Sequence, residues 1–201
     1  MEINNPQPCQ PTGKPAIRNP LAGSAGLSTN TLPREVIEGL RRLLAPASVI
    51  VCTGNELCGD DAAGLWVARK IDAAVPWKVY DVGSAPENFL FTIAQSRPEA
   101  VLVIDAMDFG GRPGEVALVG ADRIEGQGPC THGPAPEAFL ELLAQLHPCP
   151  AAVLGIQPAG VVVGAPLSAA ATASVEAVAS TLQLLGARLA SRGGGEVRAS
   201  E

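Results

Sequence analysis

The chain alternates between short, continuous apolar runs and longer stretches whose apolar residues recur at helical spacing. Runs without polar alternation are typical of strands buried on both faces of a parallel sheet. We expect strands at 48–53, 78–82, 101–104, 115–119 and 152–156, and helices after Asp61 and at 86–95, 136–146 and 168–185. This order predicts an α/β fold, a three-layer α/β/α sandwich with a twisted, mostly parallel central sheet.

The outer segments of the 201-residue chain depart from this pattern. Five prolines fall within the first twenty residues, where no apolar periodicity is found, so residues 1–30 are predicted to form a disordered Pro-rich arm. An apolar stripe in 31–47 predicts an N-terminal accessory helix. Residues 49–186 are then predicted to form the α/β domain. Residues 187–201, which contain three consecutive glycines, are predicted to form a flexible tail.

Charge and glycine spacing argue against nucleic-acid and nucleotide ligands. Fourteen Lys and Arg against twenty Asp and Glu give a net charge of −6, without a basic cluster. Gly54 and Gly59 are spaced as in a phosphate-binding P-loop, but Asp60 and Asp61 follow where Lys and Ser or Thr are needed. Glu56 likewise breaks the dinucleotide-binding glycine pattern.

The cysteines and apolar segments predict a cytoplasmic protein. The five cysteines lack the regular spacing of a disulfide framework, which favours reduced thiols. The sequence shows neither a signal-peptide pattern nor an uncharged run of about 18 apolar residues, the length that a membrane span needs.

Acidic residues follow the predicted strands. Asp60 and Asp61 come after the first, Asp81 ends the second, Asp105 ends the third, and His132 lies in the loop after the fourth. Because the carboxyl ends of parallel strands meet at one sheet edge, we expect these acids to gather there.

Three of these residues, Asp61, Asp105 and His132, would offer two carboxylates and an imidazole to zinc, nickel or a similar ion. Alternatively, Asp60 or Asp61 only caps the next helix, Asp105 only holds a loop, and His132 lies on the surface. Cys130 with His132, and His147 with Cys149, lack the spacing of a structural zinc site. Without a G-x-S-x-G motif, the nucleophile of a hydrolase would be activated water.

Five ordered motifs carry a family resemblance. The segment GNELCGDDAAG at 54–64 resembles the signature of the [NiFe]-hydrogenase maturation endopeptidases. It is followed by DVGSAPEN at 81–88, VIDAMD at 103–108 with PGE at 113–115, TH at 131–132 and LGIQP at 154–158. The SAPEN and LGIQP motifs are most similar to the hydrogenase 3, or formate-hydrogenlyase, branch. Ala62 stands where the family often has glycine.

The resemblance implies a phosphorylase/hydrolase-like fold and an endopeptidase, aspartic-type or metal-dependent. It would remove the C-terminal extension of a hydrogenase large-subunit precursor after nickel insertion. Asp61, Asp105 and His132 match the metal-contacting positions, and Asp81 matches an acid used in substrate selection. Nickel would be carried by the substrate, with no tightly bound metal in the isolated enzyme. Either the metal or a carboxylate, Asp61 or Asp105, would activate water.

Two alternatives stay open. The protein could be a same-fold peptidase that acts on a different precursor, or a non-catalytic relative that binds a metal or a partner. Exposed ligands at strand ends contribute little to folding. We therefore expect His132→Ala and Asp105→Asn to abolish processing with nearly unchanged thermal stability.

Overall fold

A single mixed sheet forms the centre of the protein. The structure, a computed structural model, describes residues 31–71, 75–121 and 136–193. Within these ranges the strand order is β2-β1-β3-β5-β4. All neighbours pair in parallel except β4, which runs antiparallel to β5 at the sheet edge. The strands are β1 Val49–Thr53, β2 Lys78–Gly83, β3 Val101–Ala106, β4 Val116–Gly120 and β5 Ala151–Ile156.

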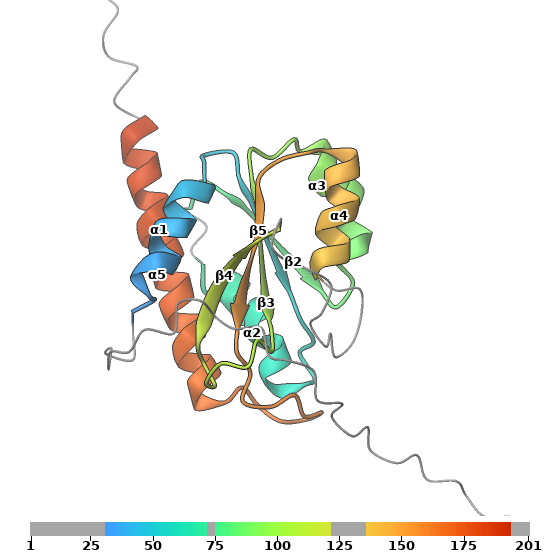
Figure 1. Ribbon diagram of the computed structural model, residues 1–201, viewed down its shortest axis with the longest axis vertical. Helices are drawn as coiled ribbons and strands as arrows, with labels where there is room; N and C mark the ends of the chain where they lie inside the picture. Colours follow the sequence, from blue (N-terminus) through green and yellow to red (C-terminus); the bar gives the residue numbers. More distant parts are fainter. Residues whose placement is uncertain (1–30, 72–74, 122–135, 194–201) are drawn as a thin grey trace, which may run out of the picture.

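Helices cover both faces of this sheet. Figure 1 shows α1 and α5 on one side and α3 and α4 on the other, which confirms the predicted three-layer sandwich. Two 3₁₀ turns, η1 Gly59–Ala62 and η2 Pro86–Phe89, each precede a helix. The helices are α1 Arg34–Leu43, α2 Ala63–Lys70, α3 Leu90–Gln95, α4 Pro136–Leu146 and α5 Ala169–Gly193.

The continuous apolar runs are explained by two cores, one on each face. Successive strand residues point to opposite faces. Ile50, Leu102 and Leu154 belong to the core with α1, α2 and α5, whereas Val51 and Val103 belong to the core with α3 and α4. Because both faces of β1, β3 and β5 are buried, a polar residue stands out only where one of these strands ends.

The last helix is longer than its sequence pattern predicts. Ser168 begins it as expected, because its Oγ accepts a hydrogen bond from the Ala171 N–H at 3.1 Å. The helix does not end near Leu185, however, and continues to Gly193, so 187–193 are helix and not a flexible tail. Leu189 packs against the core, and Ala, Arg and Leu favour helix. The predicted arm, 1–30, and the rest of the predicted tail lie outside the described residues.

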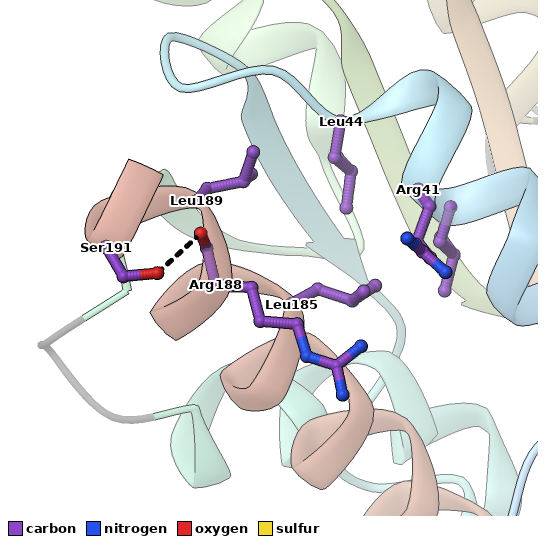
Figure 2. Close-up of a pocket in the computed structure, with 7 residues that line it drawn as sticks. Arg41, Leu44, Leu185, Arg188, Leu189 and Ser191 are labelled. Carbon is purple, nitrogen blue, oxygen red and sulfur yellow. Dashed lines mark hydrogen bonds between the residues drawn. The ribbon is translucent and has the colours of Figure 1, made fainter. Parts of the chain in front are cut away.

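The accessory helix predicted within 31–47 is α1, shorter at both ends. Val36 and Leu40 are buried, and Gly39 faces Leu118 of β4. A pocket of about 350 Å³ lies between α5 and the segment formed by α1 and Leu44. Figure 2 shows side chains that line it, among them Arg41 and Arg188. The pocket contains none of the predicted site residues. No helix among the described residues is long and apolar enough to cross a membrane.

Candidate active site

The acids lie where the sheet connections diverge. From β1 the chain passes through α2 to β2, whereas from β3 it continues to β4 and β5 on the opposite side of β1. Such a divergence between neighbouring parallel strands opens a crevice at their carboxyl ends. Asp61 lies in η1, directly after β1, and Asp105 is the penultimate residue of β3. The fold thus brings two predicted ligands to adjacent strand ends.

The loop after β1 is closed by backbone contacts to Asp61. The Asn55 N–H donates to the Asp61 carbonyl at 3.2 Å, and the Asn55 Oδ1 accepts from the Leu57 N–H at 3.0 Å. A Cβ at Gly54, whose φ is +148°, would lie 2.0 Å from that same carbonyl oxygen. Only glycine fits there, which explains the Gly-Asn pair that opens the motif.

Gly64 allows α2 to start directly against β3, which carries Asp105, and against β1, which precedes Asp61. A Cβ at this position would lie 2.3 Å from the Thr53 carbonyl oxygen and 2.4 Å from the Ile104 carbonyl oxygen. Because these atoms belong to β1 and β3, even a methyl group would push the helix away from both strand ends. The glycine therefore sets the approach of Asp61 to Asp105.

The Asp105 carboxyl has a strongly raised pKa. Desolvation at its half-buried position raises its pKa to about 7, and the nearby Asp61 carboxylate adds to the increase. A hydrogen bond of 2.9 Å from the Ala106 N–H to Oδ1 acts in the opposite direction. Because burial and repulsion between the two carboxylates disfavour its charged form, Asp105 holds a proton near neutral pH. A cation between them would stabilise the charged form of both.

The raised pKa predicts that Asp105→Asn increases stability near neutral pH. An unfolded chain ionises Asp105 near pH 3.8, whereas the folded chain keeps it protonated to about pH 7. Between these values the native state binds more protons, so its stability falls as pH rises, by up to about 1.4 kcal/mol per pH unit. Asparagine removes this loss, so near neutral pH we expect a gain in stability where the sequence alone predicted nearly unchanged stability.

Urea unfolding of both proteins at pH 4.5, 6 and 8 tests this dependence. We expect the variant's advantage in free energy of unfolding to grow from pH 4.5 to pH 7 and then level off. A difference that stays constant over this range would show that Asp105 ionises normally in the folded state.

Asp60 is a structural residue. Its buried carboxylate accepts hydrogen bonds from the Ala159 N–H at 2.7 Å and from Ser168 N–H and Oγ at 2.6 and 2.8 Å. It does not cap α2, since the start of that helix has no side-chain cap. Asp60 instead joins η1 to the loop after β5 and to the start of α5. The expectation that Asp60 or Asp61 caps the following helix is therefore wrong for Asp60.

Asp81 lies on β2, next to β1, the strand that precedes Asp61, and is exposed. Its Oδ2 is 4.0 Å from the Arg69 Nε, and the guanidinium of Arg69 also pairs with Glu56. That guanidinium lies over the Trp66 ring, 5.2 Å from its centroid. Asp81 is thus part of a solvated ion-pair network with Arg69 and Glu56.

The histidines and cysteines that were considered as metal ligands lie at separate places in the chain. His132 and Cys130 lie outside the described residues, and no group of three His, Cys, Asp or Glu among the described ones could hold a metal. A ring nitrogen of His147 is 3.0 Å from the Pro98 carbonyl oxygen, so this histidine joins two loops. Cys52 and Cys58 are buried near the acids, and burial raises the pKa of Cys52, with Asp81 adding to the effect.

Gln157 is a site residue that the sequence analysis quoted in a motif but gave no role. Its buried Oε1 accepts from the N–H groups of Phe109 and Gly111 at 3.0 Å, and its Nε2 donates to Asp108 Oδ1 at 3.0 Å. It therefore holds the loop that follows Asp105. A glutamine directly after an apolar strand run was the available signal.

Comparisons with known proteins identify the same family that the motifs resemble. The profile of HycI, hydrogenase maturation protease, matches residues 67–183, more than half of the chain. The hydrogenase 3 maturation protease of Escherichia coli K12 is 45% identical over 78 residues, 38% of this chain and 50% of that protein. The chain thus aligns with about half the length of this curated relative.

Solved structures extend the similarity to the whole fold. The solution structure of the endopeptidase HycI from Escherichia coli is 35% identical, with a TM-score of 0.61, over 68% of this chain and 89% of the other. For a hydrogenase maturation protease from Thermococcus kodakarensis the TM-score is 0.67 at 24% identity, over 73% and 97% of the two chains. Together with the profile match, this similarity shows that the chain belongs to the HycI family of hydrogenase maturation proteases.

Proposed function

We propose that this protein is a cytoplasmic endopeptidase that removes the C-terminal extension of a [NiFe]-hydrogenase large-subunit precursor after nickel insertion. The observation that carries the proposal is the position of Asp61 and Asp105 at the carboxyl ends of the neighbouring strands β1 and β3, in a chain of this family. Asp61, Asp105 and His132 would contact nickel that the precursor's thiolates already hold. Asp81 would contribute to substrate selection.

The electrostatics of the acid pair support recognition of a cation. A positive ion between the two carboxylates would relieve their repulsion and displace the proton that Asp105 holds near neutral pH. Because this ion arrives with the substrate, the scissile peptide would be positioned only when nickel is present. Nickel would thereby license cleavage.

Two routes lead to hydrolysis of the peptide bond. A water molecule could be polarised by nickel, or Asp61 or Asp105 could take its proton. A carboxylate whose pKa is about 7, as for Asp105, is well matched to proton transfer at neutral pH. The isolated enzyme is expected to hold no tightly bound metal, because its ligands would contact nickel only together with the precursor that carries the ion.

The proposal is tested with purified precursor in nickel-loaded and nickel-free forms. Mass spectrometry should detect a shortened product from the loaded form alone. Equal cleavage of both forms would contradict nickel recognition. Binding without cleavage of either form would instead favour a non-catalytic relative, and cleavage of only another precursor would favour a peptidase with a different substrate.

A further inference from the structure

An uncharged apolar surface adjoins the acid-bearing turn. Three side chains form it: Leu57 in the loop after β1, and Val162 and Val163 in the loop after β5, which are 69%, 60% and 78% exposed. We call these three residues the apolar patch. Residues 57–59 and 157–168 contain no charged side chain, and the charge of Glu56, which precedes Leu57, is paired with Arg69.

Backbone hydrogen bonds hold the two loops of the patch together. The Gly164 N–H donates to the Leu57 carbonyl at 2.7 Å, and the Asp60 N–H donates to the Gly160 carbonyl at 3.3 Å. Within the second loop, the Ala165 N–H donates to the Val162 carbonyl at 3.1 Å. The apolar side chains are thus presented by a connected backbone and need little ordering when a partner binds.

The same contacts fix the patch relative to the acids. The Asp60 carboxylate binds the Ala159 and Ser168 N–H groups of the second loop. The next residue is Asp61, whose N–H donates to the Cys58 carbonyl at 3.2 Å. Leu57 and Asp61 therefore lie on the same segment after β1, to which the loop of Val162 and Val163 is hydrogen-bonded, so a polypeptide that reaches Asp61 approaches the patch.

We propose that the apolar patch is the docking surface for an uncharged apolar segment of the precursor polypeptide, beside the bond to be cleaved. This inference rests on the proposed function. Exposed apolar groups clustered beside a reactive centre typically mark a binding surface. The three side chains of the patch carry no charge, so an acidic or basic segment would lose hydration there without forming an ion pair. Burying apolar side chains against the patch would instead lower the free energy of binding.

The test compares the double variant Leu57→Gln/Val163→Gln with Leu184→Gln. Leu184, 64% exposed on α5, is the matched control because it lies outside the patch. With nickel-loaded precursor, we expect the double variant to raise KM roughly tenfold with kcat nearly unchanged. Leu184→Gln should match the wild type in both constants.

Calorimetric titration with nickel-free precursor, which the proposed mechanism leaves uncut, separates docking from catalysis. We expect the double variant to bind roughly tenfold more weakly than the wild type and the control. Equal binding by all three proteins, or no binding by the wild type, would overturn the docking surface. Patch-dependent binding without any cleavage of loaded precursor would instead retain the patch and refute the proposed peptidase activity.

Discussion

Asp105→Asn is expected to reduce cleavage of nickel-loaded precursor by roughly 10³-fold or more, the usual scale for losing an acid–base or metal-contacting group. Asparagine has nearly the same shape, but it neither balances the charge of a cation nor accepts a proton from water. Single-turnover cleavage followed by mass spectrometry measures this loss. The increased stability expected at pH 8 would show that the loss does not reflect unfolding.

Asp108→Asn is the matched control for this experiment. Asp108 lies three residues downstream, is exposed, and uses Oδ1 to accept hydrogen bonds from the Gly110 N–H and the Gln157 amide. Asparagine retains that acceptor oxygen, so cleavage should stay close to the wild-type rate. Equal losses in the two variants would contradict a specific role for Asp105.

Asp60→Ala is expected to have the largest effect on stability, a decrease of about 3 kcal/mol in the free energy of unfolding. The substitution leaves the N–H groups of Ala159 and Ser168 without their part-buried acceptor and removes a short contact to the Ser168 hydroxyl. Asp60→Asn keeps one acceptor oxygen and should lie between alanine and the wild type. Chemical denaturation measures this series.

Measurements of activity and of stability should therefore distinguish the role of Asp105 from that of Asp60. Asp105→Asn loses activity and gains stability near neutral pH, whereas Asp60→Ala loses stability and affects activity through the position of Asp61. An Asp60→Ala protein with wild-type stability would show that the hydrogen bonds to the loop after β5 contribute little to the fold.

Much of the fold could be predicted from the sequence because the central strands are buried on both faces. The apolar runs locate β1, β3 and β5 to within a residue or two, and the alternating helices predict the layers. The antiparallel direction of β4 could not be predicted, because its apolar run is equally compatible with either pairing. The extension of α5 was missed because the three glycines after Arg192 dominated the pattern of the last fifteen residues.

The site was predictable in position but only partly in role. The strand-end argument placed Asp61 and Asp105 together, and in the structure the Asp61 carboxylate is near enough to contribute to the raised pKa of Asp105. It could not distinguish Asp60 from Asp61, because adjacent residues in a 3₁₀ turn point in different directions and only packing shows which one is buried. Gln157 was missed for a similar reason, since its partners lie almost fifty residues away in the chain.

The buried thiols have a consequence for the fate of the nickel. Soft thiolates hold nickel more strongly than carboxylates do, so an exposed thiolate beside the acids could extract the metal from the precursor. Cys52 and Cys58 are both buried, and the raised pKa of Cys52 keeps it as the thiol. In the proposed function, the acids among the described residues would contact nickel through oxygen, and we expect the ion to stay with the precursor and its mature product.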